Sequence, residues 1–350
     1  MTIPVILVGY GYSGRVIHGP LIQTAEGLHL AAVVSSAPDK VKNDLPNIEI
    51  FRSLDESLAA TSDGLVIIAN PTESHYPLAR QALVAERHVV IEKPFTVSTA
   101  EADELIALAN TANRKLGVFH NRRWDDDYLC IRNLIEEGRL GRIQLFDAYF
   151  DRFRPDVRDR WREQARPGAG ALYDLGSHLI DQALQLFGTP DDVYADIGAQ
   201  RSGPADDYCL LSLRFGDCRA TLRCASLVPE SSLRYAVHGD NGSFIRYGLD
   251  PQERALQMGL RPGDFGWPGI PAQSSTILYK SLAGQVPHKH ILSLESGRYD
   301  VFYAMTARAI QDDLDPPVTA LDARNVIAII EAARGSAKHG KRLPLPGKLK

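Results

Sequence analysis

Cysteine is scarce in this chain, and the spacing of the few cysteines excludes several kinds of site. Without a Cys-x-x-Cys pair or a Cys/His cluster at zinc-ligand spacing we expect no metal site, and a zinc-dependent alcohol dehydrogenase is excluded. We interpret the cysteines as small buried thiols, which fits a reducing compartment. There are four in 350 residues: Cys130, Cys209, Cys218 and Cys224.

Long apolar runs and blocks of one charge are also missing. No stretch approaches the roughly 18 apolar residues of a membrane span. The first apolar run begins at Ile3, with no cationic segment before it and no small-residue cleavage site after it. The 39 basic and 43 acidic residues are interspersed, so no basic block is available to neutralise nucleic-acid phosphates. We therefore expect a cytoplasmic protein with neither a membrane nor nucleic acid as partner.

The first third of the chain alternates short strands rich in Val and Ile with longer helical patterns, such as those at 75–86 and 100–112. This alternation is typical of a parallel sheet covered on both faces. It predicts a doubly wound α/β domain, of the Rossmann type, over residues 1–120. The predicted strands are 5–8, 30–34, 65–69, 89–91 and 116–119.

After residue 120 the strands alternate apolar and polar residues instead. Turn signals join them at 215–217 and 239–242. Hairpin after hairpin predicts a second domain over 121–350, with an open, mainly antiparallel sheet and helices on one face. A loop rich in Pro and Gly at 261–273 is a place where specificity can reside. The predicted strands are 142–154, 208–214, 219–227, 234–237 and 244–247, and closing helices are predicted at 299–311 and 321–334.

The first predicted strand runs directly into a Gly-x-Gly-x-x-Gly motif. In such a motif the first glycine permits a tight turn, the second lets the backbone approach a pyrophosphate, and the third allows a helix to pack closely on the strand. The helix that follows presents free N–H groups to the anion. In this strand–turn–helix context the motif predicts dinucleotide binding, and the alternative is a glycine-rich turn with no ligand. The motif is Gly9-Tyr10-Gly11-Tyr12-Ser13-Gly14.

The end of the second predicted strand bears on which dinucleotide is bound. A carboxylate there would bind the ribose hydroxyls and repel a 2′-phosphate. Ser35 and Ser36 stand where that acid would be. Asp39 lies beyond a proline, and Lys40 and Lys42 follow. Hydroxyl donors near lysines suit a 2′-phosphate, so we favour NADP, with NAD still open; alternatively, both lysines are simply solvated.

Glu92-Lys93-Pro94 follows the fourth predicted strand, at the carboxyl edge where open α/β sheets bind ligands. A lysine there can hold a substrate hydroxyl and stabilise the oxyanion that develops as hydride leaves. A cis Lys93–Pro94 bond would fix the turn that aims the lysine. Position alone also allows Lys93 to be a solvated surface residue.

Residues 168–187 have the periodicity of one amphipathic helix. Asp174, His178, Asp181 and Gln185 line the stripe opposite its apolar face. Asp174 and His178 are therefore neighbours, and a histidine beside a carboxylate suits a general base. From the pattern alone, the wet side of a helix is the favoured interpretation.

Together these motifs resemble the glucose–fructose oxidoreductase/inositol dehydrogenase family, also called Gfo/Idh/MocA, nearly end to end. That family combines a lysine in a Glu-Lys-Pro turn with an Asp-x-x-x-His on a helix of the second domain, which maps onto Lys93, Asp174 and His178. The resemblance is carried by the glycine motif, Asn70-Pro71 with His75 following, Glu92-Lys93-Pro94, and Asp174-Leu175-Gly176-Ser177-His178.

The resemblance implies reversible oxidation of a secondary carbinol of a polyol or sugar. His178 would accept the hydroxyl proton while hydride passes to the nicotinamide, Lys93 would hold that oxygen, and Asp174 would orient the substrate or His178. Closer similarity to NADP-dependent scyllo-inositol dehydrogenases suggests an inositol-like substrate; it is carried by 120–125, 160–163 and 173–182.

Two sets of binding residues follow. Arg122, Arg123 and Trp124 can line the cleft, and the alternative is a salt-bridged junction with Asp125 to Asp127 as partners. For the substrate we predict contacts from Lys93, Arg122, Trp124, Asp174 and His178. For the cofactor we predict contacts from Gly9, Gly11, Tyr12, Ser13, Gly14, Ser35, Ser36, Lys40, Asn70, Pro71, His75, Glu92 and Lys93.

Two other functions compatible with this fold stay open. One is a non-catalytic dinucleotide sensor or corepressor, which would have no need of Lys93, Asp174 and His178 together. The other is a glycosidase that uses bound NAD for transient oxidation. An exposed face of the second-domain sheet is a natural subunit contact, so we expect a homodimer or homotetramer.

Overall fold

The computed structural model describes residues 2–61, 63–230, 232–269, 275–280 and 286–345, so part of the predicted loop 261–273 lies outside the described residues. The chain divides into two compact units. The predicted boundary after residue 120 lies beside the division after Asn121, but it does not include the return of two later segments to the first unit. The first unit comprises Met1–Asn121, Gln252–Gly269 and Arg298–Arg324, and the second comprises Arg122–Pro251, Ile270–Gly297 and Asn325–Lys350.

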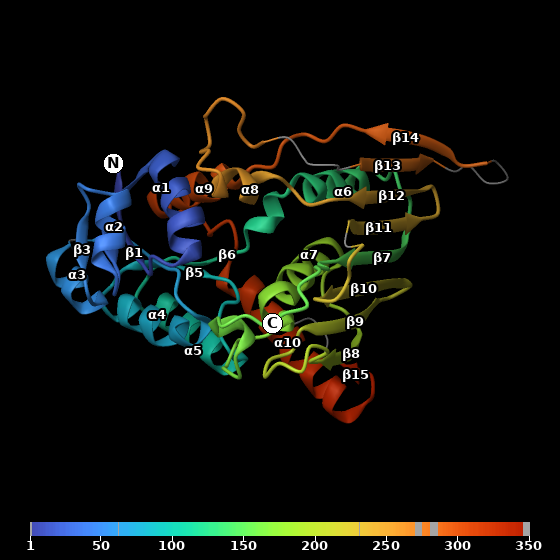
Figure 1. The fold of residues 1–350 in the computed structure, drawn as a ribbon, viewed down its shortest axis with the longest axis horizontal. Coiled ribbons are helices and arrows are strands. Elements are labelled where there is room, and N and C mark those ends of the chain that lie inside the picture. The colour runs from blue at the N-terminus through green and yellow to red at the C-terminus, as the bar shows by residue number, and fades with distance from the viewer. Residues whose placement is uncertain (1, 62, 231, 270–274, 281–285, 346–350) are drawn as a thin grey trace. The chain divides into compact units, whose positions relative to one another are not determined.

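A six-stranded parallel sheet forms the centre of the first unit. In spatial order its strands are β3 (Glu49–Phe51), β2 (Leu28–Val34), β1 (Ile3–Val8), β4 (Leu65–Ile68), β5 (His88–Glu92) and β6 (Leu116–Phe119) (Figure 1). Strands β4 and β5 are buried along their full length, so continuous apolar runs suit them better than alternation. The strand order reverses between β1 and β4, and open α/β sheets bind ligands outside such a reversal. The doubly wound prediction is confirmed.

Helices cover both faces of this sheet (Figure 1). One face carries α1 (Gly19–Thr24) and α9 (Tyr299–Gln311). The other carries α3 (Leu54–Ala60), α4 (His75–Val84) and α5 (Thr99–Thr111). Helix α9 comes from the far end of the sequence, and its Phe302 packs on Phe119 of β6 with ring centroids 4.8 Å apart. The unit also contains α2 (Pro38–Asp44) and α8 (Gln252–Gln257).

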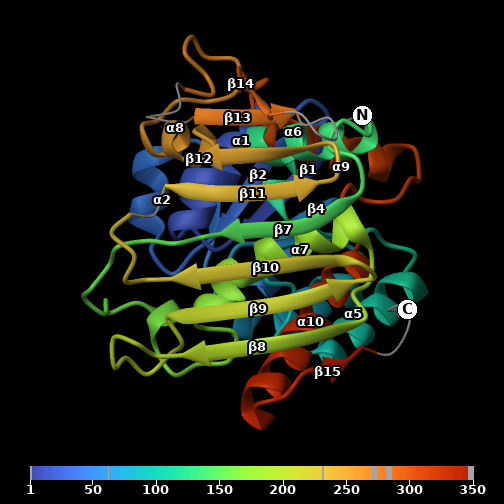
Figure 2. The same cartoon turned by 90° about the vertical axis from the view of Figure 1, so that its right-hand side faces the viewer.

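A nine-stranded sheet forms the centre of the second unit (Figure 2). The prediction of an open, mainly antiparallel sheet is confirmed. One neighbouring pair, β7 and β10, is parallel, which the hairpin pattern did not predict. In spatial order the strands are β14 (His288–Leu292), β13 (Ser275–Lys280), β12 (Gly242–Tyr247), β11 (Leu233–Gly239), β7 (Ile143–Tyr149), β10 (Cys218–Ala225), β9 (Tyr208–Phe215), β8 (Asp192–Gly198) and β15 (Leu343–Pro344).

The helices of the second unit lie on one face of its sheet (Figure 2). They include α6 (Asp126–Glu136), α7 (Ser177–Phe187) and most of α10 (Ala320–His339). Because they cover one face, alternate strand residues are buried, as in β9. Over the opposite face, Figure 2 shows no helix among the described residues of this unit. In the whole described part of the chain, every helix is too short or too polar to span a membrane.

Candidate active site

The glycine motif forms a tight turn directly after β1. Gly9 has φ +96°, a backbone conformation that residues other than glycine rarely adopt. A Cβ added to Gly14 would lie 2.0 Å from the carbonyl oxygen of Gly9, so only glycine lets the helix approach the turn this closely. A Cβ added to Gly11 would meet nothing within 4 Å, and Gly11 is exposed. The backbone at Gly11 is thus open to a ligand, while Gly9 and Gly14 serve the turn itself.

The turn after β4 lies against the glycine motif. Asn70 Oδ1 is 2.8 Å from the Cβ position that Gly9 would have. This oxygen is buried and has no hydrogen-bond partner among the described residues. A buried amide acceptor without a partner costs stability unless a ligand or water supplies a donor. Asn70 Oδ1 and the open backbone at Gly11 together fit a dinucleotide at this edge of the sheet.

His75 joins two of the turns at this edge. Its Nε2 is 2.9 Å from the Asn70 carbonyl oxygen, and its Nδ1 is 2.9 Å from that of Pro94. Burial lowers the pKa of the imidazole, with backbone carbonyls opposing the shift. His75 therefore holds the turn after β4 to the turn after β5. Pro71 is the N-cap of the short helix η2 (Thr72–Ser74) that precedes His75.

Glu92, at the end of β5, is a buried carboxylate inside a polar chain. Its Oε1 accepts a hydrogen bond from Ser13 of the glycine motif and lies 3.2 Å from His18 Nε2. His18 in turn contacts the hydroxyl of Tyr303. Burial alone would raise the pKa of Glu92, but hydrogen bonds from His18 and Ser13 and the charges of His18 and Lys93 bring it to about 2. Glu92 thus stays ionised and ties Ser13 to the strand end that carries Lys93.

Lys93 follows β5 directly and is half-buried. Its peptide bond to Pro94 is cis, as the sequence analysis anticipated. Tyr12, within the glycine motif, is exposed, and its hydroxyl donates a hydrogen bond to Glu253 of α8 at 2.9 Å. In the first unit, the ends of β1, β4 and β5 therefore bring together the predicted cofactor residues from the glycine motif to Lys93.

The end of β2 carries the predicted determinants of the ribose site. The Ser35 hydroxyl accepts from the Ala37 N–H at 3.1 Å and shapes the turn. Ser36 and Lys40 are exposed, and Lys40 lies in the first turns of α2. Asp39 also belongs to the first turn of that helix. The structure thus leaves Ser36 and Lys40 open to solvent after β2, with no carboxylate at the strand end.

In the second unit, Asp174 and His178 lie on consecutive helical segments. Asp174 belongs to the π-helical segment η5 (Leu172–Gly176), and His178 to the first turn of α7. The helix does not begin at residue 168 as predicted, because Gly168 and Gly170 have φ of +75° and +93°. π-Helical turns of this kind are frequent at functional sites.

The prediction of a wet stripe on this helix is wrong for two of its residues. His178 and Asp181 are only 5% and 2% exposed. Asp181 is buried because Arg123 binds it with two hydrogen bonds, of 2.9 and 2.6 Å. Asp174 keeps part of its surface and accepts from Arg162 Nε at 3.0 Å. The two acids of this stripe, Asp174 and Asp181, are therefore each held by an ion pair to an arginine.

Phe150, which the sequence analysis did not single out, lies beside the His178 imidazole. The two rings stack with centroids 6.3 Å apart and planes inclined by 30°. Three guanidinium groups lie over the same phenyl ring, those of Arg122, Arg152 and Arg234, at 4.8, 5.1 and 4.7 Å from its centroid. Cations favour the face of an aromatic ring. The Phe150 ring thus contacts both the His178 imidazole and three guanidinium groups. No local pattern in the sequence indicates these contacts.

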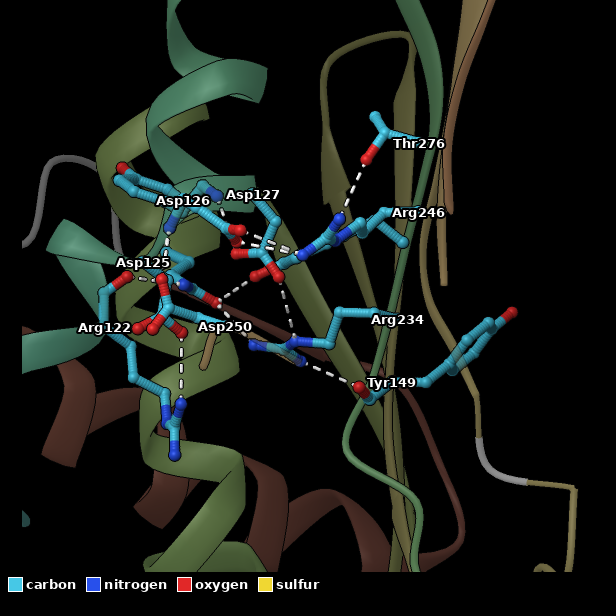
Figure 3. Close-up of polar contacts among 12 residues, drawn as sticks. Arg122, Asp125, Asp126, Asp127, Tyr149, Arg234, Arg246, Asp250 and Thr276 are labelled. Atoms are coloured by element: carbon cyan, nitrogen blue, oxygen red, sulfur yellow. Dashed lines mark hydrogen bonds and ion pairs between the residues drawn. The ribbon is translucent and has the colours of Figure 1, made fainter. Parts of the chain in front are cut away.

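Arg122 belongs to a buried charged cluster at the start of α6 (Figure 3). Its Nη1 lies 3.1 Å from Asp125 Oδ2, and Arg246 lies within 3.1 Å of both carboxylate oxygens of Asp126. Burial and the neighbouring Asp127 raise the pKa of Asp126 to about 7, while Arg246 opposes the shift. The salt-bridged alternative thus describes Arg122, whereas Arg123 pairs with Asp181. Trp124 ends the short helix η3 (Asn121–Trp124) and is half-buried.

Among the described residues, no group of three or more His, Cys, Asp or Glu side chains is arranged to hold a metal ion. All four cysteines are free thiols.

Two family models together match most of the chain. Residues 3–120 match the model described as "Oxidoreductase family, NAD-binding Rossmann fold". Residues 132–345 match "Oxidoreductase family, C-terminal alpha/beta domain" of the same GFO_IDH_MocA family. The two matched ranges correspond to the Rossmann-type sheet and the open sheet.

Individual relatives match over nearly the full length. The oxidoreductase YdgJ of Escherichia coli K12 is 41% identical, covering 98% of this chain and 99% of its own. The scyllo-inositol 2-dehydrogenase (NADP(+)) IolW of Bacillus subtilis 168 is 39% identical, covering 98% and 96%. Among solved structures, the oxidoreductase YvaA of B. subtilis is similar with a TM-score of 0.94 at 39% identity, covering 99% of both chains.

Proposed function

The chain belongs to the Gfo/Idh/MocA family of oxidoreductases and has its NAD(P)-binding domain, and on this basis we propose that it is an NADP-dependent dehydrogenase of polyols or sugars. The observation that carries the proposal is the presence of both halves of the family's chemistry. Lys93 follows the dinucleotide-binding strands of the first unit, and His178 lies beside Asp174 on η5 and α7 of the second.

The cofactor in this proposal is NADP, with NAD as the competing possibility. Support comes from the strand end at β2, where Ser36 and Lys40 are exposed and no carboxylate stands to repel a 2′-phosphate. IolW, one of the similar proteins, is named for NADP. When bound, the dinucleotide supplies the acceptor or donor of hydride. The open backbone at Gly11 would lie against its pyrophosphate, and Asn70 Oδ1 would accept a hydrogen bond from a donor of the dinucleotide such as a ribose hydroxyl, since both offer groups that the protein itself leaves open.

In the proposed reaction the chain's own residues manage the proton and the charge on one carbinol oxygen. His178 accepts the hydroxyl proton, and Asp174 orients either the imidazole or the substrate. Lys93 donates a hydrogen bond to the same oxygen and stabilises the negative charge that develops there. Phe150 fixes the imidazole plane by stacking. General acid–base help of this kind contributes about 10²–10⁴-fold, and positioning supplies most of the remainder.

An inositol-like polyol is the substrate we propose, on the strength of the similarity to IolW. The test is turnover of purified protein with inositols, aldoses and keto-sugars, each with NADP and with NAD, followed at 340 nm. We expect cofactor reduction with at least one polyol or sugar, and faster with NADP. Sugar release from glycosides without net reduction would instead indicate the glycosidase, and tight cofactor binding without either reaction would indicate a sensor.

We also propose that the protein is a cytoplasmic homodimer or homotetramer. The open face of the second unit's sheet supports this, because it presents apolar side chains such as Leu145 and Tyr194, which are 45% and 37% exposed. A two-fold contact would bring this face against the same face of a second copy. Light scattering after gel filtration should therefore give an oligomer, and Leu145→Asp should shift it towards the monomer.

A further inference from the structure

The chain continues past β7 as an extended segment that carries two arginines towards the His178 side of the sheet. The N–H groups of Phe150, Arg152 and Arg154 donate to the carbonyls of Arg223, Ala225 and Ser226, each at 2.8 Å. Alternate residues of an extended segment point to the same face. Phe150 is buried against His178, and the Arg152 guanidinium lies over the Phe150 ring. Arg154 follows in the same alternation.

Arg154 is half-buried and has no acidic partner within bonding distance among the described residues. The acids nearby are engaged elsewhere. Asp151 binds Arg223 at 2.6 Å, and Asp174 binds Arg162 at 3.0 Å. Glu163 binds Arg160 at 2.6 Å and Arg201 at 3.2 Å.

The charges around Arg154 are mostly of its own sign. Burial and the positive charges of Arg152, Arg160 and Arg158 together lower the pKa of its guanidinium to about 10, while the negative charge of Asp174 opposes them. Like charges kept together at a half-buried position repel one another, and an anion that accepts hydrogen bonds from them relieves this repulsion. A solvated arginine on an ordinary surface has neither the burial nor the cationic neighbours.

We infer that Arg154, with Arg152 beside it, forms a subsite for an anionic group on the substrate, so that the preferred substrate is a sugar or polyol bearing a phosphate or a carboxylate. This rests on the proposed function for the reaction itself. The placement supports it, since Arg152 shares the Phe150 ring with His178 and Arg154 interacts with the Asp174 charge. The guanidinium group suits both anions, because a carboxylate and a phosphate each offer two oxygens to which two N–H groups of one arginine can donate.

The experiment measures ligand binding by calorimetry on the full chain with NADP present. The probes are matched sets: glucose, glucose 6-phosphate and glucuronate, and myo-inositol with myo-inositol 1-phosphate. The variants are Arg154→Gln, Arg154→Lys and the control Arg132→Gln, which removes an exposed arginine of α6 that pairs only loosely with Glu136 at 3.7 Å. In the wild type, binding is also measured as the salt concentration rises from about 50 to about 300 mM, because added salt screens charges and weakens their pairing.

We expect at least one anionic probe to bind roughly tenfold or more tightly than its neutral parent, as charge-assisted hydrogen bonds would give. That preference should fall about tenfold in Arg154→Gln, survive in part in Arg154→Lys, persist in Arg132→Gln and weaken with salt. The phosphate and carboxylate arms show which anion is preferred. Equal binding of neutral and anionic probes, or a preference that is unchanged in Arg154→Gln, would overturn the inference. If Arg154→Gln does not fold, a preference insensitive to salt overturns it.

Turnover of the same probes at 340 nm separates this inference from the proposed function. Arg154-dependent binding of anions without any cofactor reduction would uphold the subsite and contradict the dehydrogenase. Reduction driven by neutral polyols, with no preference for their anionic counterparts, would uphold the dehydrogenase and overturn the subsite.

Discussion

We call the end of the first unit's sheet that carries the glycine motif, Asn70, Glu92 and Lys93 the cofactor edge. The cofactor edge and the surroundings of His178 in the second unit are held in place by different kinds of contact. At the cofactor edge the backbone dominates: Gly9 and Gly14 are required by close approaches of the main chain, and His75 holds two turns through their carbonyls. Around His178, side chains dominate, with Phe150 stacked on the imidazole and Arg123 paired with Asp181. Substitutions should therefore act differently in the two regions.

The largest effect is expected from removing the reacting groups of either region. Lys93→Ala and His178→Ala should each lower kcat by about 10²–10⁴-fold, because each loses a proton or charge contact made in the transition state. Cofactor affinity, measured by fluorescence titration with NADPH, should change little in His178→Ala and far less than kcat in Lys93→Ala. His29→Ala, at an exposed position of β2, is the control. A kcat near that of the wild type in either variant would remove its residue from the mechanism.

Two glycine variants test whether the backbone controls the cofactor edge. Gly14→Ala places a Cβ 2.0 Å from the Gly9 carbonyl oxygen, so it should destabilise the fold by about 1–3 kcal/mol and weaken cofactor binding. Gly11→Ala meets nothing within 4 Å in the protein, so it should leave the melting temperature unchanged while still weakening NADPH binding. Equal stability losses in both variants would show that this reading of the turn is mistaken.

Glu92 is the exception at the backbone-dominated edge, since its carboxylate links Ser13 and His18. Glu92→Gln should cost roughly 1–3 kcal/mol at neutral pH through the loss of hydrogen bonds to a charged group. Its pKa lies below the ordinary 4.5, at about 2, so its contribution to stability is present above pH 4.5 and is lost as the pH falls towards 2. Urea unfolding from pH 7 to pH 2 should show this loss in the wild type and in the exposed control Glu136→Gln, but a smaller loss in Glu92→Gln.

The smallest effect is expected at the solvent-exposed end of the cofactor edge. Lys40→Ala should weaken NADP binding by about 0.2–1 kcal/mol, at most roughly fivefold, and NAD binding less, because only NADP carries the 2′-phosphate. Lys42→Ala, two residues further along α2, is the matched control. Equal losses for both dinucleotides in Lys40→Ala would leave the preference for NADP without a basis in this residue.

The cofactor edge could be predicted from sequence because its determinants are local. A glycine motif directly after a buried strand fixes both the turn and its place in the sheet, and Glu92-Lys93-Pro94 follows its strand in the same way. What could not be predicted is the partner of Glu92: His18 comes from the π-helical segment η1 (Ser13–His18), and the Tyr303 that contacts His18 is 285 residues further along the chain.

The surroundings of His178 were harder to predict for the same reason. Helical periodicity placed Asp181 on a wet stripe, but the structure buries it because Arg123, 58 residues earlier, supplies a paired charge. Periodicity counts apolar residues and does not register a polar residue that is buried through a distant partner. Phe150 was missed because it lies in an alternating apolar and polar run like many others, and only the folded chain brings it to the imidazole.

The central claim is that the protein moves hydride between a carbinol carbon and the nicotinamide, and isotope transfer tests it most directly. Scyllo-inositol, myo-inositol and glucose, each deuterated at carbon, would be supplied one at a time with NADP⁺, and the reduced cofactor would be analysed by mass spectrometry. We predict that reduced cofactor forms with at least one of them and carries one deuterium. Reduced cofactor that carries only solvent hydrogen would contradict the account, as would the absence of reduced cofactor with all three and with glucose 6-phosphate and myo-inositol 1-phosphate deuterated in the same way.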